Sequence, residues 1–159
     1  MDHLQYTDLF RKISERNPDL QHSEDPDKAT TFYRVNVFEF ETSLKKFSKF
    51  PAMALEASSS QGKGNIDNLQ ELHTAAFTIW GKATKKHDAA EEDEVLSQCK
   101  GIVNDCFKMF LSDLEALIEL GDTTTVISID VESVKINKVG PYHGFYHGYR
   151  CQFSFTSKF

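Results

Sequence analysis

One long stretch of helical periodicity, from Asp88 to about residue 120, constrains the fold of this chain more than any other feature. Apolar residues recur every three or four positions along it, which places them on one face of a single α-helix. Asp88 and Glu91 are spaced as in a capping box, and acidic residues 91–94 suit the positive end of the helix dipole. We therefore expect one helix whose core-facing stripe consists of Leu96, Cys99, Val103, Cys106, Phe110, Leu114 and Leu117.

Segments with strand-like patterns precede and follow this helix. Residues 31–36 (TFYRVN) and 52–57 (AMALEA) are short, and 72–83 (LHTAAFTIWGKA) alternates between apolar and polar positions. Alternation over 127–131 changes phase before 134–136, which predicts a bulge near Glu132 and Ser133. We expect Gly140-Pro141 to end that strand. A half-buried last strand is predicted by the alternation of Tyr149, Cys151, Phe153 and Phe155 with polar residues.

The N-terminal part of the chain predicts two shorter helices. Tyr6, Leu9, Phe10 and Ile13 share one face of a helix that ends before residue 17, and a polar loop with two prolines follows. A second capping box, beginning at Asn36, predicts a helix that continues to about residue 47.

The length of 159 residues suits one domain, 1–159, with an N-terminal helix and polar loop (1–30) and a core over 31–156. The order of the elements predicts an α+β fold. We expect an antiparallel or mixed sheet of four to five strands, packed by one long helix and shorter N-terminal helices.

Charge and composition exclude several classes of protein. The net charge is −6, and the lysines are scattered, as in LKKFSKF and GKATKKHD, rather than massed, which argues against direct binding of nucleic acid. No apolar run reaches the roughly 18–20 residues of a membrane-spanning helix, and the N-terminus lacks the apolar core of a signal peptide. Three cysteines without a CxxC pair fit a reducing compartment, so we expect a cytoplasmic protein with no membrane association.

The segment 139–155, VGPYHGFYHGYRCQFSF, contains two histidines four residues apart. On a helix His143 and His147 would share a face, but two glycines and a proline disfavour a helix here, and a metal would need further ligands. We predict instead a long loop, 141–149, between two strands. Because tyrosine, phenylalanine and arginine are enriched at protein contacts, we expect it to touch a neighbouring subunit through Tyr142, Phe145, Tyr146, Tyr149 and Arg150.

Residues 58–65 (SSSQGKGN) predict a polar arm or hairpin, and its Gln61 and Lys63 are further candidate interface residues. The spacing of a phosphate-binding P-loop is absent there. No GxSxG motif, dinucleotide fingerprint or activated cysteine occurs in the chain. We therefore predict no catalytic, cofactor-binding or metal-binding residues, and a protein that is not an enzyme.

The succession of segments resembles small phage and prophage tail-completion, or tail-terminator, proteins over residues 31–156. It consists of FYRVN leading into a helix, a FPAMALEA strand before a polar arm, HTAAFTIWGKA, one long helix, and a closing strand pair in which Gly148-Tyr149-Arg150 opens the last strand. The resemblance implies an α/β homo-oligomer that forms a hexameric ring, caps a phage tail tube and joins it to the head connector. It implies tail-tube and head-connector proteins as partners, no cofactor, and a place in a virion or tail-like particle.

Two other functions remain open from the sequence. The first is a small cytosolic ligand-binding or regulatory domain, whose pocket between sheet and long helix would be lined by Phe77, Trp80 and Phe110. The second is an enzyme that uses His143 or His147.

Overall fold

The structure, a computed structural model, describes residues 3–25, 27–28, 30–35, 44–47, 49–65, 67–120 and 128–158. Within these ranges the chain forms a mixed six-stranded sheet, one long helix and an N-terminal helix, which confirms the α+β prediction. The sixth strand, one more than expected, lies in the predicted polar arm. The elements in order are α1 (His3–Arg16), β1 (Phe32–Val35), β2 (Ala52–Glu56), β3 (Ser59–Lys63), β4 (Gln70–Lys82), α3 (Ala89–Glu119), β5 (Ser128–Tyr142) and β6 (Tyr146–Lys158).

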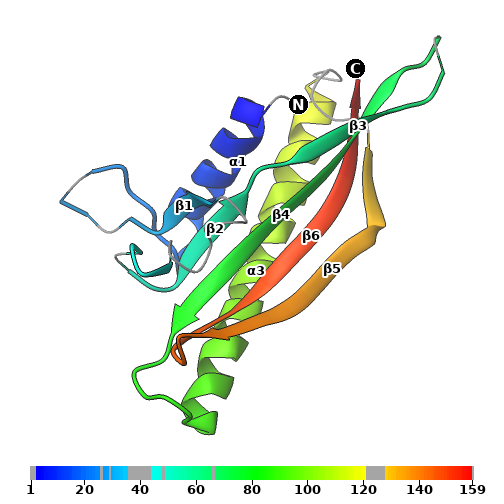
Figure 1. Ribbon diagram of the computed structural model, residues 1–159. Helices are drawn as coiled ribbons and strands as arrows, with labels where there is room; N and C mark the ends of the chain where they lie inside the picture. The colour runs from blue at the N-terminus through cyan, green and yellow to red at the C-terminus, as the bar shows by residue number, and fades with distance from the viewer. Residues whose placement is uncertain are drawn as a thin grey trace.

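The sheet has the order β1-β2-β4-β6-β5, and both helices cover one of its faces (Figure 1). β1 and β2 are parallel, whereas the other pairs are antiparallel. β2 and β3 lie along the same edge of β4, with Leu55 opposite Phe77 and Ser59 opposite Thr74. The register therefore changes by one residue between β2 and β3, as at a β-bulge, and the side chains of the two strands are out of phase.

The main core lies between the helices and the sheet. Phe10 of α1 is fully buried at its centre, where its ring centroid lies 5.1 Å from that of Phe77 on β4 and 5.0 Å from that of Phe110 on α3. The predicted stripe of α3 is buried here from Leu96 to Leu114, and Leu117 is partly buried. Gly81 lets α3 approach β4, because an added Cβ would lie 2.4 Å from the side chain of Val95.

A second, smaller core covers the opposite face of the sheet. Its buried members are Val35, Leu44, Phe47, Ala52, Ala54, Trp80 and Tyr146. Ala52 and Ala54 alternate along β2 with Met53, which belongs to the main core. The sheet is thus buried on both faces near β2, which explains why AMALEA contains so few polar residues.

Several local predictions are confirmed, and two are wrong. Asp88 caps α3 as predicted, accepting a hydrogen bond from the Glu91 amide at 3.2 Å. The bulge predicted in β5 appears as a register shift between Asp130 and Lys135. Gly140-Pro141 does not end β5, which continues past a second register shift to Tyr142. The predicted loop 141–149 is also wrong, because β6 already begins at Tyr146.

Two of the predicted elements fall partly on residues that the structure does not describe. Residues 36–43 of the helix predicted from Asn36 lie outside the described ranges, as does Ile127 of the predicted strand over 127–131. Neither described helix has the length and apolarity needed to cross a bilayer.

Candidate functional site

The connection between β5 and β6 is a tight turn of three residues rather than a long loop. His143 and Gly144 both have positive φ, 52° and 77°, and the Phe145 amide donates to the Tyr142 carbonyl at 3.2 Å. Such angles are typical of the turns that join antiparallel strands. The strands leave too few residues for a free aromatic loop, so Tyr142 and Tyr146 face each other as strand partners.

Tyr146 and His147 lie inside the molecule. Tyr146 is 9% exposed, packs 5.4 Å from the ring of Phe50 and belongs to the second core. His147 is fully buried on the helix side, and its Nε2 lies 3.8 Å from a carboxylate oxygen of Glu92 on α3. The two histidines therefore point into different surroundings, because His143 is exposed in the turn.

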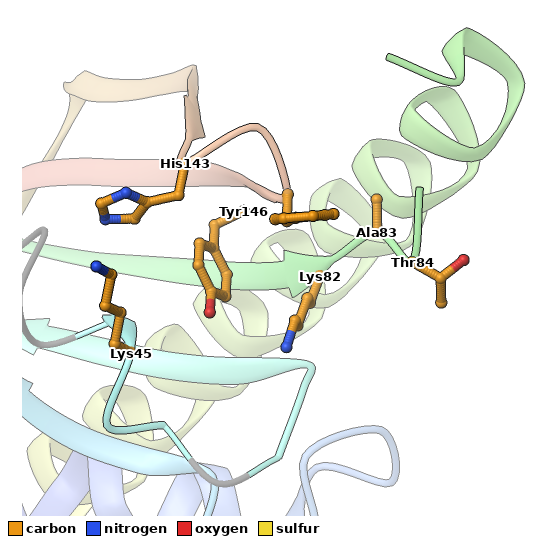
Figure 2. Close-up of a pocket in the computed structure, with 7 residues that line it drawn as sticks. Lys45, Lys82, Ala83, Thr84, His143 and Tyr146 are labelled. Carbon is orange, nitrogen blue, oxygen red and sulfur yellow. The ribbon is translucent and has the colours of Figure 1, made fainter. Parts of the chain in front are cut away.

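An open pocket of about 640 Å³ lies beside this turn, at the end of β4 (Figure 2). Its size falls within the range of small-molecule sites. Figure 2 shows the Tyr146 ring between the side chains of Lys45 and Lys82 in this view. The complete lining is Lys45, Lys82, Ala83, Thr84, His143, Phe145 and Tyr146.

The frame of the pocket is held by hydrogen bonds from two sides. The Ala83 amide donates to the Phe145 carbonyl at 2.8 Å, which ties the end of β4 to the turn. On the other side, the carboxylate of Glu91 accepts hydrogen bonds from the amide and hydroxyl of Thr84, both at 2.7 Å, and from the Lys85 amide at 3.1 Å. These bonds lower the pKa of Glu91, the Thr84 hydroxyl most of all. Glu91 thus fastens the 83–85 segment instead of completing the predicted capping box.

Positive charge gathers at this pocket. No described residue that lines it is acidic, and among the described residues neither Lys45 nor Lys82 forms an ion pair. The ammonium group of Lys82 lies 5.7 Å from the ring centroid of Tyr146, and that of Lys86 lies 5.0 Å from that of Phe145. Both distances fit cation–π contacts.

The sequence does not predict this concentration of positive charge, because the lysines of LKKFSKF and GKATKKHD are scattered along the chain. The fold brings Lys45 from the first run and Lys82 from the second to one pocket. The only indication in the sequence is that each of the two segments contains several lysines. Lys45 and Lys82 come together through contacts between segments nearly forty residues apart, which no local pattern predicts.

The other predicted interface residues lie elsewhere. Tyr149 is half-buried beneath α3, where the Lys100 ammonium lies 5.8 Å from its ring centroid. Arg150 is bound within the subunit by Glu56. Gln61 and Lys63 are exposed on β3, at the far end of the molecule: Lys63 pairs with Gln70, and twelve residues of β4 separate that position from Lys82. Twelve residues of strand span roughly 40 Å.

The alternative of a ligand pocket between the sheet and the long helix does not agree with the packing of the residues that would line it. Phe77 and Phe110 are fully buried and both contact Phe10, which fills the space between them. Trp80 belongs to the second core on the opposite face. The three side chains therefore do not line a common pocket.

Two buried side chains, His73 and Ser157, form a pair that resembles a catalytic dyad. The His73 Nε2 lies 2.7 Å from the Ser157 Oγ, and a carboxylate oxygen of Glu71 lies 3.5 Å from the same nitrogen. A triad needs its carboxylate at the other ring nitrogen. Ser157 is also completely buried, so a substrate cannot reach it. We interpret the pair as a satisfied contact between β4 and β6.

Neither the cysteines nor the acidic residues build a second reactive centre in the described part of the chain. Burial raises the pKa of Cys99, Cys106 and Cys151 to about 12, which keeps these thiols protonated and unreactive. No group of three or more potential metal ligands occurs among the described residues.

Comparison with known proteins finds no family model that matches this sequence, and no curated protein is significantly similar to it.

Proposed function

We propose that this protein is a non-enzymatic structural subunit that assembles with copies of itself, and that the edge of β3 takes part in the contact. By its resemblance to phage tail terminators, the assembled form would be a ring that caps a tail tube and joins it to a head connector. Its assembly would take place in the cytoplasm, with tail-tube and head-connector proteins as partners.

The observation that carries this proposal is the state of β3. All five of its residues are exposed, and no described strand pairs with its outer edge. Such an edge carries unpaired amide and carbonyl groups, onto which a further strand can add. Monomeric proteins usually protect such edges with charged side chains, and β3 carries only one, Lys63, so its open edge supports a role in assembly.

The shape of the hairpin supports the same proposal. β3 and the start of β4 extend beyond the part of the sheet that the helices cover (Figure 1). Leu69, beside its tip, is 43% exposed, although leucine is normally buried. The phase change between β2 and β3 places Gln61 and Lys63 on the face opposite the helices. A neighbouring subunit can therefore reach both residues without displacing a helix.

The mass in solution tests this proposal. Light scattering over a range of concentrations should give a multiple of the 18.1 kDa subunit mass. Gln61→Pro with Lys63→Pro removes two amide donors and is poorly accommodated in a strand, so this variant should have the mass of a monomer.

The matched control is Gln61→Thr with Lys63→Thr, which keeps the strand and should keep the assembled mass. Because β3 contributes nothing to either core, all variants should retain the helical circular dichroism and the cooperative unfolding of the natural chain. A natural chain that stays monomeric at every concentration would contradict the proposal and favour the ligand-binding alternative.

A further inference from the structure

We propose that the pocket formed by Lys45, Lys82, Thr84, His143, Phe145 and Tyr146 binds a small organic phosphate. The phosphate would lie between the two lysines, and a planar part of the ligand would lie against Phe145. This binding activity is additional to assembly, because the pocket and the β3 edge lie at opposite ends of β4.

The charge of the pocket selects an anion. The chain as a whole carries a net charge of −6, yet two lysine side chains enter this pocket and that of Lys86 lies beside it. The nearby carboxylate of Glu91 faces Thr84 and the backbone of the 84–85 segment, where hydrogen bonds hold it. An anion on the side of Lys45 and Lys82 therefore meets two cations, and Glu91 is not among the residues that line the pocket.

The donors available favour a phosphate over a carboxylate. Lys45 and Lys82 offer ammonium groups without ion-pair partners in the described part of the chain, and Tyr146 and His143 add a hydroxyl and an imidazole. A phosphate presents three acceptor oxygens and up to two charges, so it can satisfy more of these donors than a carboxylate does. Lysine is a common phosphate ligand because it acts as a mobile point charge.

The aromatic residues favour a ligand with a planar group. Phe145 is only partly buried, and its ring already accepts the Lys86 ammonium on one face at 5.0 Å. Tyr146 is fixed by its packing on Phe50 and needs no rearrangement to form the floor. Stacking of a base on an aromatic side chain is a recurrent contact in proteins that bind single-stranded nucleic acids.

Calorimetry with three related compounds tests the proposal. Adenosine monophosphate carries both groups, inorganic phosphate carries only the anion, and adenosine carries only the planar part. We expect adenosine monophosphate to bind most tightly, phosphate more weakly, and adenosine not at all at about 10 mM. Lys45→Ala with Lys82→Ala should weaken binding of adenosine monophosphate at least about tenfold. Phe145→Ala should bring its affinity close to that of phosphate.

Lys108→Ala with Lys138→Ala removes the same charge from two exposed positions outside the pocket and should leave binding unchanged. Since all four lysines are exposed, both double variants should fold normally, which circular dichroism verifies. The proposal is overturned if adenosine monophosphate does not bind at about 10 mM, or if both double variants bind it equally. Equal binding of phosphate and adenosine monophosphate would overturn the assignment of the planar group.

Discussion

Arg150 of β6 reaches across β4 and binds both carboxylate oxygens of Glu56 on β2, at 2.6 Å and 2.8 Å. Gln152 accepts a further hydrogen bond from the same guanidinium at 2.7 Å. The hydrogen bonds that Arg150 donates to Glu56 raise the pKa of Arg150. The side chain of Glu56 is only 12% exposed. The bidentate pair therefore joins β2 to β6 across β4, on the face opposite the helices and largely shielded from water.

Breaking this pair should destabilise the fold. We expect Glu56→Gln and Arg150→Met each to lower the free energy of unfolding by about 1–3 kcal/mol, because each leaves a half-buried partner with fewer hydrogen bonds. The double variant should lose less than the sum, with a coupling of about 1–2 kcal/mol in urea unfolding. The exposed pair Arg11 and Asp8, 2.8 Å apart, is the control and should give a much smaller coupling. Equal couplings for the two pairs would contradict this prediction.

Phe110 should be among the most costly residues to truncate. It is fully buried between Phe10 and Phe153, with ring centroids at 5.0 Å and 4.9 Å. Phe110→Ala should lower the free energy of unfolding by about 3–5 kcal/mol. Ile118→Ala, at a position 43% exposed on the same helix, should cost less than about 1 kcal/mol. A loss below about 1 kcal/mol for Phe110→Ala would mean that α3 does not pack on the sheet in this way.

The three thiols should be protected in the folded protein. With pKa values raised by burial to about 12, they should not react with a disulfide reagent at neutral pH until the chain unfolds. The unfolded chain ionises its thiols near pH 9.0, whereas the folded chain keeps them protonated up to about pH 12. Stability should therefore fall as the pH rises from 9.0 towards 12. Rapid labelling of any thiol in the native protein would refute this.

His73 should make the fold sensitive to acid. Desolvation lowers its pKa below 6.5, with the Glu71 carboxylate opposing the shift. Below pH 6.5 the unfolded chain takes up a proton that the folded chain binds more weakly, so the free energy of unfolding falls as the pH decreases. His73→Gln should reduce this slope. An unchanged slope in His73→Gln would assign the effect to another group.

Removal of metal should have no effect on stability. His143 is exposed and His147 is buried, so the two histidines of the doubled Tyr-His-Gly do not face one site. We expect dialysis against a chelator to leave the melting temperature unchanged. A decrease that zinc restores would show that the histidines bind metal after all.

Patterns with a local physical cause could be predicted from the sequence. The period of α3, its cap at Asp88 and the bulge in β5 follow from side-chain spacing and turn chemistry. Leu20 was not predicted, because it lies in a polar segment, although it is fully buried and its carbonyl accepts from Thr31 at 2.9 Å. Its burial depends on where that segment returns to the sheet.

The candidate site was harder to predict from the sequence than the secondary structure. One reason is the doubled Tyr-His-Gly motif, which suggests a loop. Glycine and proline there were interpreted as loop formers, but Gly148 lies in β6, where an added Cβ would lie 2.4 Å from the Ile79 carbonyl oxygen. The glycine thus permits close strand approach instead of a turn. For this reason the sequence predicts Tyr146 as an intersubunit contact, whereas in the structure its side chain belongs to the second core.

The division of the apolar side chains between two faces of one sheet implies that the molecule opens in stages. The smaller core is closed by residues of the 44–50 segment, including Leu44 and Phe47, whereas the larger one is closed by two helices. Backbone amides of β1 should therefore exchange with deuterated solvent through a partial opening that leaves α3, β4 and β6 closed. Central amides of β4 and β6 should exchange only when the whole chain unfolds, so the slowest protons belong to the sheet under α3.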